Sequence, residues 1–464
     1  MNLILFAILA YIALQLLIAW RFRRKTESES DYLLAGRSLG PWLATFAVFA
    51  TWFGAETCIG AAGEAYAHGL SGVVADPFGY TLGLLAVGLL VAGPLWKRGV
   101  TTLADLFRQR YGAGVERLAA IIMIPSSLLW AAAQVRAFGQ VLASASELGL
   151  LAAMTLAAAV VIAYTAFGGM WSDAVTDLVQ GIVLIAGLLG LAAVFFWQGG
   201  AQQLAALPAE RLNPLHERSA WDFAETLLTP VFSTIVAQEL ASRVLAMRSP
   251  GLARGATLGA AGLYFAMAAI PLMLGLAALG LMGAGIEPEQ VLSRYAESRL
   301  PLPLYVLFLG ALVSAILSTL SGALLVAGSL AAHNLLLPLR PRWDERAKLR
   351  ANRVAVVLFG VVAYAIALAS DSVYGLVEEA AGLGSAGIFV LLMDSLWRRG
   401  GLGSPAAAYT ALLAGTGVFL AGAHLFDWQT PYLAALAAAA LGYLLVAALD
   451  RSKPRSAAGL AGPA

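Results

Sequence analysis

The sequence predicts an all-α polytopic membrane protein with about 13 transmembrane helices. Of its 464 residues, 60% are hydrophobic and only 12% are charged, whereas soluble domains carry about a quarter charged residues. The apolar residues form runs of about 20 or more, the length that a helix needs to cross the hydrocarbon core. Short basic stretches separate these runs. Too few polar residues remain to cover the surfaces of soluble domains.

The predicted spans follow one another closely along the chain. Several exceed the ~20 residues needed for one crossing, which allows a tilt or a break within the span. Their approximate extents are 2–20, 41–66, 73–95, 116–142, 147–167, 172–198, 223–246, 255–284, 302–335, 352–370, 373–396, 403–424 and 431–449.

The basic residues predict the orientation of these spans. Four of them follow the first apolar run directly, between Arg21 and Lys25. A secretory signal peptide carries its charge before the apolar run, so residues 2–20 are expected to remain as a helix with its N-terminus outside. If the spans then alternate, all but five of the 29 basic residues lie inside, as the positive-inside rule requires. We expect an N-out, C-in, multi-pass protein of the inner (plasma) membrane. The five exceptions are Arg136, Arg211, Arg218, Arg294 and Arg299.

Composition and motifs argue against several classes of function. The formal net charge of +2 offers no footprint for nucleic acid. A single cysteine, Cys58, allows neither an internal disulfide nor a zinc cluster of thiolates. No Walker pattern occurs, which argues against ATP-driven transport. The four histidines fall at span ends or in loops, so we expect no catalytic residues and no enzyme.

Three regions place polar residues or glycines at membrane depth, where a charge costs about 2.5–3.5 kcal/mol or more. The stretch 49–64 carries Glu56 and Glu64 among glycines, and such a stretch can unwind and point carbonyls at a cation. In the stretch 164–180, Gly168 and Gly169 are expected to form a turn between two spans.

Asp177 then lies about one turn inside the next helix, where an acidic residue indicates an ion pathway, while Asp173 is expected nearer the surface. In the third region, 314–322, Ser318 and Thr319 face about 100° apart, and Ala315 lies about one turn before Ser318.

Each region also has a purely structural interpretation. The glycines suit tight helix packing, the aspartate suits a pairing with a neighbouring backbone group or arginine, and the hydroxyls suit hydrogen bonds to their own helix. Taken together, however, the three regions fit a sodium ion, a hard cation that takes five or six oxygens much as calcium and magnesium do. Two carbonyls from a broken helix, with one carbonyl and two hydroxyls from a second helix, would supply five.

At these residues the sequence resembles the sodium:solute symporter family, from Asp31 to the last span. The resemblance is carried by the glycine-rich second span through Gly63 and by the stretches 164–180, 238–249 and 315–321, in this order and spacing. It implies a LeuT-like architecture of two inverted repeats of five helices, with the first helix of each repeat broken. The breaks would fall near 53–56 and within 230–239.

This resemblance divides the chain into five segments. An extra N-terminal helix and a cytoplasmic loop come first, then two repeats joined by an external loop, and finally two C-terminal helices with a cytoplasmic tail. The expected boundaries are 1–40, 41–198 for the first repeat, 199–222 for the loop, 223–396 for the second repeat and 397–464.

The resemblance also implies the ligands of the coupling ion, Na⁺. The family's sodium site maps onto the backbone oxygens of Ala50, Phe53 and Ala315 and onto the hydroxyls of Ser318 and Thr319.

Asp177 matches an aspartate on the sodium exit path, which in some relatives also holds a second sodium together with serines. Ser318 and Ser321 remain here, but Gly322 stands where some relatives carry a further serine, and this difference counts against a second sodium.

Within the family, residues 50–180 look closest to the high-affinity choline transporters. Trp52, Tyr80 and Trp130 match aromatic residues that surround the choline ammonium in those proteins, and a cation between ring faces gains about 0.5–2 kcal/mol per contact. A fourth aromatic is replaced by Ala237, beside Gln238 and Glu239.

Glu56, together with Glu64, Asp76 and Glu239, would also suit an amine-bearing solute. The alternative is that the matching tryptophans, drawn from 11 in the chain, serve packing or the membrane interface.

The resemblance implies sodium-coupled symport of a small organic solute into the cell by alternating access. The expected partners are the solute, sodium and the lipid bilayer, without nucleic acid or an obligate protein partner. Two alternatives stay open: a proton-coupled carrier of the same fold in which Asp177 or Glu56 titrates, and a transporter-like solute sensor.

Overall fold

In this computed structural model, the described residues 3–22, 27–144, 146, 148–397 and 402–452 form 20 α-helices and, apart from one isolated β-bridge between Leu39 and Met247, no strands. The predicted all-α class is confirmed. The α-helices are α1 (Leu3–Phe22), α2 (Glu29–Leu34), α3 (Pro41–Trp52), α4 (Ala61–His68), α5 (Tyr80–Ala86), α6 (Ala92–Lys97), α7 (Leu103–Tyr111), α8 (Ala113–Ser144), α9 (Leu150–Trp197), α10 (Gly200–Ala205), α11 (Ala220–Val236), α12 (Gln238–Leu245), α13 (Pro250–Met282), α14 (Val291–Arg299), α15 (Leu302–Ser329), α16 (Glu345–Ala369), α17 (Val373–Gly382), α18 (Ser385–Trp397), α19 (Pro405–His424) and α20 (Pro431–Ser452). Four π-helical turns interrupt or extend them, η3 (Glu56–Gly60), η5 (Val74–Gly79), η6 (Val87–Val91) and η9 (Leu330–Leu336).

By length and apolar character, nine of the described helices could cross a membrane, or ten if the pair α17–α18, bent by 43°, counts as one span. The other three predicted spans do not pass as single helices. α3 stops at Trp52 after 12 residues, the apolar helix before Gly168 runs only from Leu150 to Ala166, and α11 ends at Val236 after 17 residues. The described residues therefore contain fewer unbroken apolar helices than the 13 predicted crossings.

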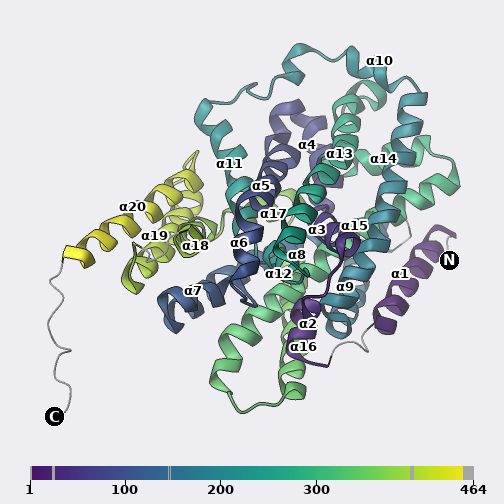
Figure 1. The fold of residues 1–464 in the computed structure, drawn as a ribbon. Helices are drawn as coiled ribbons and strands as arrows, with labels where there is room; N and C mark the ends of the chain where they lie inside the picture. The colour runs from purple at the N-terminus through teal and green to yellow at the C-terminus, as the bar shows by residue number, and fades with distance from the viewer. Residues whose placement is uncertain (1–2, 23–26, 145, 147, 398–401, 453–464) are drawn as a thin grey trace, which may run out of the picture.

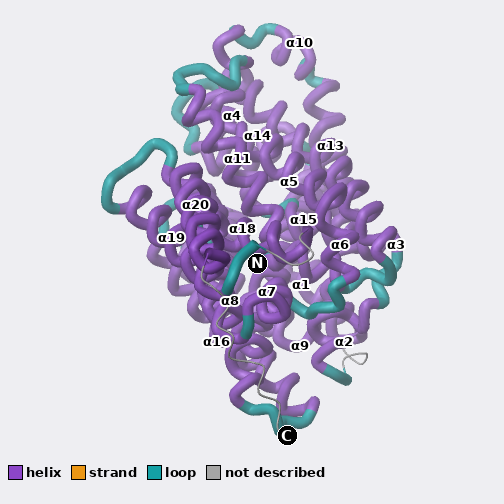
Figure 2. The backbone as a smooth tube through the Cα atoms, turned by 60° about the vertical axis from the view of Figure 1, so that its left-hand side comes forward, coloured by secondary structure: helices purple, strands orange, loops and turns teal. Residues whose placement is uncertain are grey.

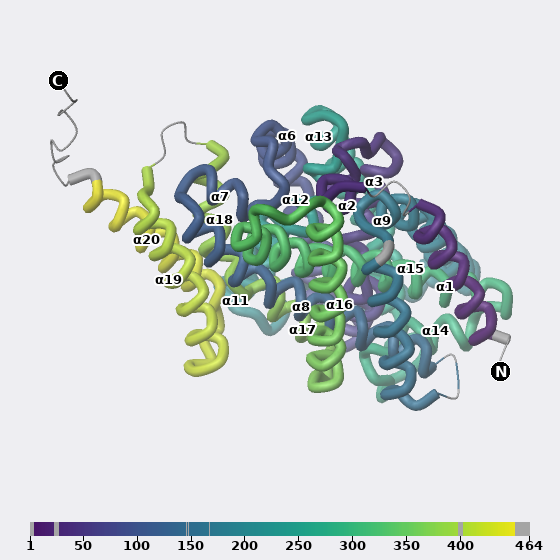
Figure 3. Tube along the Cα trace, turned by 90° about the horizontal axis from the view of Figure 1, so that it is seen from below, coloured from purple at the N-terminus to yellow at the C-terminus, as the bar shows by residue number. Residues whose placement is uncertain are grey.

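The centre of the bundle is α15. Every residue from Ala311 to Leu330 is buried, and the helix packs against α3, α8, α9 and α16. By contrast, α1 exposes Leu17 and Trp20 and α20 exposes Leu445, as helices that face lipid do. Figures 1 and 3 place α1 at one edge of the bundle and the pair α19–α20 at the opposite edge.

Both predicted helix breaks are confirmed. α3 ends where Phe53 leaves helical geometry (φ −89°, ψ 81°), and the chain resumes in the π-helical turn η3. The second break is a single residue, Ala237 (φ −65°, ψ 122°), between α11 and α12.

The expected turn at the glycine pair is also present. Inside α9, Gly169 adopts φ 68° and ψ 176°. A Cβ at this position would lie 2.8 Å from the ring of Tyr32, so both the backbone conformation and the close approach require glycine.

The segments expected on one side of the membrane contact one another. On the inner side, Arg98 donates to the carbonyl of Ser395 at 2.6 Å. On the outer side, Arg211 donates to the carbonyl of Ala65 at 2.6 Å. Figure 2 shows the corresponding separation, with α10 at one end of the bundle and α2 and α16 at the other. Seven of the basic residues expected inside lie outside the described residues, namely Arg23, Arg24, Lys25, Arg398, Arg399, Lys453 and Arg455.

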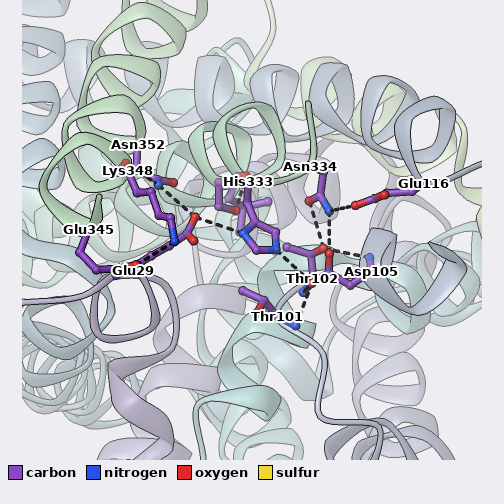
Figure 4. A network of polar contacts seen from close by, with 12 residues as sticks. Glu29, Thr101, Thr102, Asp105, Glu116, His333, Asn334, Glu345, Lys348 and Asn352 are labelled. Carbon is purple, nitrogen blue, oxygen red and sulfur yellow. Dashed lines mark hydrogen bonds and ion pairs between the residues drawn. The ribbon is translucent and has the colours of Figure 1, made fainter. Parts of the chain in front are cut away.

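A polar network joins the helices at the end of the bundle expected to face the cytoplasm, called the inner end below (Figure 4). His333 lies between two carboxylates, with Nδ1 3.1 Å from Glu29 Oε1 and Nε2 3.2 Å from Asp105 Oδ2. Because carboxylate oxygens only accept hydrogen bonds, both ring nitrogens must donate, which requires an imidazolium. The neighbouring Asn334 donates to Asp105 Oδ1 at 2.9 Å and to Glu116 Oε1 at 3.0 Å. The network thus ties η9, which follows α15 directly, to α2, α7 and α8.

The carboxylate of Asp105 also caps α7. Its Oδ2 accepts the backbone N–H groups of Thr101 and Thr102, each at 3.0 Å. Burial by itself would raise the pKa of this carboxyl, but the hydrogen bonds and charge of His333 and the two backbone donors hold the pKa of Asp105 below its usual value. The carboxylate therefore stays ionised at neutral pH.

We expect His333→Ala to destabilise the inner end by about 1.5–3 kcal/mol, because hydrogen bonds to charged groups are lost and two carboxylates lose their shared cation. The measurement is thermal unfolding in detergent. Since the network uses an ionised Asp105 with a depressed pKa, the deficit should be full at neutral pH and shrink as the pH falls below about 4.

The matched control is Lys348→Ala, which removes only a partly exposed ion pair with Glu345 and should cost about 0–1 kcal/mol. Equal melting temperatures for His333→Ala and the unmodified protein at pH 7 would contradict this role.

Candidate functional site

The break in α3 exposes a carbonyl to the hydroxyls of α15. Ser318 Oγ donates to the carbonyl oxygen of Ala50 at 2.7 Å, and Thr319 Oγ1 donates to the same oxygen at 3.2 Å. Ser318 Oγ also lies 3.0 Å from the carbonyl oxygen of Ala315. The structure thus brings together four of the five expected sodium ligands. The fifth, Phe53, lies at the end of α3, one residue beyond its last helical position.

These oxygens are arranged in a way that a hard cation could use. All lie in the buried interior, and the two hydroxyls reach across to another helix. They are therefore not confined to hydrogen bonds within their own helix. A cation of this kind takes oxygens at about 2.3–2.6 Å, so on binding each hydroxyl would turn its proton away and present a lone pair.

Asp177 is completely buried in α9, and neither of its carboxylate oxygens is hydrogen-bonded within the described part of the chain. Its Oδ2 lies 3.5 Å from Nη2 of Arg243. This arginine, on α12, also pairs closely with Asp173 and donates from Nε to Thr51 Oγ1 at 2.9 Å. Ser321 donates to Asp173 Oδ1 at 2.5 Å, so it contacts Asp173 and not Asp177.

The expectation that Asp173 lies nearer the surface is wrong. Its side chain is only 5% exposed, because Arg243 reaches it from a helix 70 residues further along the chain. The guanidinium also occupies the space beside Gly322, where an added Cβ would lie 3.1 Å from Arg243 Nη2. The signals for this cluster in the sequence were Asp177 at membrane depth and Arg243 near the end of the span 223–246.

Five of the six expected solute residues line one small cavity. The rings of Trp52 and Trp130 meet edge to face, with centroids 5.1 Å apart, and Tyr80, Gln238 and Glu239 complete this part of the wall. The cavity has a volume of about 40 Å³, whereas pockets for organic ligands usually have about 300–1,000 Å³. This inner cavity must open further before an organic solute can fit.

Gln238 and Glu239, in the wall of this cavity, are held by neighbouring helices. Gln238 accepts a hydrogen bond from the backbone N–H of Leu103 at 2.7 Å and donates to Ser242 Oγ at 3.0 Å. Glu239 accepts from Ser127 Oγ on α8 at 2.6 Å. Their positions are therefore defined without a ligand.

A larger outer cavity of about 320 Å³ lies beside the inner one. It is bounded by α11, α17 and the pair α19–α20, and Tyr80 belongs to the walls of both cavities. Glu56, the sixth expected solute residue, lines this outer cavity and not the inner one, together with Asp76. Both carboxylates are only 1% exposed.

The partners of these two carboxylates are neutral. Glu56 Oε2 accepts from Gln134 Nε2 at 2.7 Å, and Asp76 accepts from the hydroxyls of Tyr264 at 2.6 Å and Thr57 at 2.8 Å. Among the described residues, neither carboxylate forms a salt bridge. Buried charge without an opposite charge is costly, so this place suits either a cation or a bound proton.

Comparison with known proteins adds an independent observation, since the sequence profile described as the sodium:solute symporter family matches residues 32–407. The chain belongs to the sodium:solute symporter family. It is accordingly a multi-pass membrane transporter and not an enzyme, and family members couple transport to Na⁺.

The alignments with several relatives cover most of this chain. The high-affinity choline transporter 1 of Drosophila melanogaster is 29% identical over 408 residues, which are 84% of this chain and 65% of that protein. The human high affinity choline transporter 1 is 28% identical over 431 residues, covering 85% and 73%. The osmoregulated proline transporter OpuE of Bacillus subtilis is 27% identical over 417 residues, covering 84% and 83%. The symporter thus spans about two thirds of the length of the choline transporters.

Solved structures agree on the fold. A Na⁺-coupled sialic acid symporter in a substrate-bound outward-open state superposes with a TM-score of 0.83 at 17% identity, covering 97% of this chain and 98% of that one. A nucleobase-cation-symport-1 family transporter gives a TM-score of 0.62 at 16% identity, covering 91% and 95%. At these identities the likeness concerns the fold alone.

In the symporter, Arg243→Met should lower the free energy of unfolding by about 3–5 kcal/mol, because it leaves buried Asp173 without its cation. The double variant Arg243→Met with Asp173→Asn should recover a large part of that loss. Thermal unfolding in detergent measures both.

Arg218→Met serves as the control, since its pair with Asp222 is partly exposed and should be worth about 0–1 kcal/mol. If the double variant were as unstable as Arg243→Met alone, the uncompensated charge would not be the cause.

Proposed function

We propose that this protein carries a small organic cation into the cell together with sodium, by alternating access across the plasma membrane. The observation that carries the proposal is the meeting of two α15 hydroxyls with the carbonyl of Ala50 at the broken end of α3. A site made from a broken helix and a second, intact helix joins two parts of the bundle that can move relative to each other.

The proposed topology has 13 crossings with the N-terminus outside and the C-terminus inside. Residues 41–198 and 223–396 form two inverted repeats, each opened by a broken helix. Residues 1–40 and 397–464 flank them, and the external loop 199–222 joins them. The breaks at Phe53 and Ala237 support this division, because each interrupts the first span of its repeat.

The proposed sodium ligands are the carbonyl oxygens of Ala50, Phe53 and Ala315 and the hydroxyls of Ser318 and Thr319. Sodium would draw the broken end of α3 towards α15 and stabilise the conformation that receives solute, and this coupling must be reciprocal. A membrane potential of about 100 mV supplies ~2.3 kcal/mol per ion, and a tenfold sodium gradient adds about 1.4 kcal/mol. One sodium could thus sustain an accumulation of several hundredfold.

We propose an amine-bearing, choline-like solute. Glu56 and Asp76 line the outer cavity with neutral partners only, so an ammonium group would supply the missing positive charge. Trp52, Tyr80 and Trp130 offer aromatic surfaces next to them, and such surfaces suit a cation with methyl groups. The solute would enter the outer cavity, and the inner cavity would widen beyond Tyr80 to admit it.

A proton-coupled carrier of the same fold is the second candidate. Asp177 has no hydrogen bond to its carboxylate in the described structure, and Glu56 has only a neutral partner, so either group could carry a proton. Transport driven by a pH gradient in the absence of sodium would favour this candidate. Solute binding without uptake would favour a sensor.

Replacing Ser318 and Thr319 together by alanine should raise the sodium concentration for half-maximal stabilisation or uptake by about tenfold or more, since each ~1.4 kcal/mol of lost binding is tenfold. Thermal shift of the purified protein in sodium against potassium measures it without knowledge of the solute.

The control is Ser314→Ala on the same helix, whose hydroxyl contacts Tyr11 and the carbonyl of Gly310 instead. It should leave the sodium response intact. An unchanged response in the double variant would remove the sodium assignment.

Choline and other small amines should raise the melting temperature in sodium more than in potassium, and neutral or anionic solutes should not. A ligand at 100 times its Kd stabilises by about 2.7 kcal/mol. Asp76→Asn and Glu56→Gln should each abolish the response to amines, because they remove the charge that faces the ammonium.

Glu64→Gln is the matched control, since Glu64 lies in the same predicted span but pairs with His68. Stabilisation by proline, and not by any amine, would overturn the proposed solute class.

A further inference from the structure

One side chain joins the broken helix α3 to the outer cavity. Gln134, on α8, is completely buried. Its Oε1 accepts the backbone N–H of Ala55 at 3.0 Å, and its Nε2 donates to Glu56 Oε2 at 2.7 Å. A single amide therefore binds both the unwound backbone and the carboxylate that lines the cavity.

The contact between Gln134 and Ala55 lies close in the chain to the proposed sodium site. Phe53, the proposed sodium ligand, is followed by Gly54 and then by Ala55, whose N–H falls in the break between α3 and η3. A buried N–H without a partner costs about 1–3 kcal/mol. Gln134 satisfies this donor and so holds the backbone just after Phe53.

The same face of α8 reaches the second break. Ser127, Trp130 and Gln134 are spaced by three and four residues, which places them on one side of the helix. Ser127 donates to Glu239 at 2.6 Å, two residues after the break at Ala237, and Trp130 packs against Trp52 at the end of α3. α8 thus contacts both broken helices and the inner cavity through one row of side chains, and Gln134 binds Glu56 of the outer cavity.

We propose that Gln134 couples the sodium site to the solute site. This inference rests on the proposed function. When sodium draws in the carbonyl of Phe53, Ala55, two residues further along the chain, moves with it, and Gln134 transmits this movement to Glu56. Gln134 is a positioning residue in this scheme, since it touches neither the ion nor the solute.

The chain contains its own reporter for the test. Cys58 is the sole cysteine and is buried in η3, so a thiol reagent reaches it only when the segment after the break opens. In the unmodified protein, sodium compared with potassium should slow alkylation of Cys58 by N-ethylmaleimide severalfold. Sodium alone is the probe, so the identity of the solute does not enter.

Gln134→Leu should make alkylation of Cys58 faster in potassium and insensitive to sodium, because Ala55 and Glu56 are no longer held together. Gln140→Leu is the matched control, since Gln140 lies on the same helix but donates to Glu289 at the outer end. It should keep the sodium effect of the unmodified protein.

The variant Gln134→Glu distinguishes a coupling role of Gln134 from a role in packing alone. It keeps an acceptor for Ala55 but can donate to Glu56 only if the two carboxyls share a proton. The other acidic residues that line this cavity add to the repulsion, namely Asp76, Asp222, Glu225, Glu378 and Glu379. The sodium effect should therefore be lost at pH 8 and return as the pH falls, and this variant also serves if Gln134→Leu does not fold.

The outcomes distinguish this inference from the proposed function. If sodium does not alter alkylation of Cys58 in the unmodified protein, the sodium site itself fails. If sodium slows alkylation equally in the unmodified protein and Gln134→Leu, or if Gln134→Glu shows no dependence on pH, only the role of Gln134 is overturned.

Discussion

The hydrogen bonds from Ser318 and Thr319 to the carbonyl of Ala50 connect a largely buried helix at the centre of the bundle to a helix that is broken in mid-bundle. α15 is buried along most of its length and contacts helices on several sides. α3 ends in mid-bundle, and its last carbonyls need partners because no further helical turn satisfies them. The hydroxyls of α15 meet this need, and the same oxygens form the proposed sodium site. A break that would be costly in lipid is thus placed where it can bind an ion.

The buried acidic residues fall into groups with different electrostatic surroundings. Asp173 is paired with Arg243, so its charge is largely compensated within the protein. Glu56 and Asp76 have neutral hydrogen-bond partners and line a cavity. Unlike the pairing of Asp173 with Arg243, this second arrangement leaves a negative charge for a ligand to balance, and it is therefore the stronger indication of a binding site. A carboxylate at membrane depth is informative only once its partner is known.

The two ends of the bundle differ in how tightly their helices are joined. At the inner end, His333 and its carboxylates join η9, which follows α15 directly, to α2 and α7, and the segments expected in the cytoplasm pack on one another. Towards the other end, the outer cavity has about 320 Å³, while the inner cavity next to it has only about 40 Å³. In the proposed transport cycle, a solute from the outside would meet Glu56 and Asp76 first and the tryptophans afterwards.

The sequence by itself determined the features that depend on neighbouring residues. Apolar runs predicted the helices, and the glycine pair predicted the turn at Gly169. The resemblance predicted breaks near 53–56 and within 230–239, and the structure has them at Phe53 and Ala237. It also named Ala50, Ala315, Ser318 and Thr319, which the structure brings together. Only the tertiary structure decided which polar side chains meet. Gln134 lies 78 residues from Glu56 and Arg243 lies 70 residues from Asp173, and no local pattern encodes such contacts, because they arise from the packing of helices that are distant in the chain.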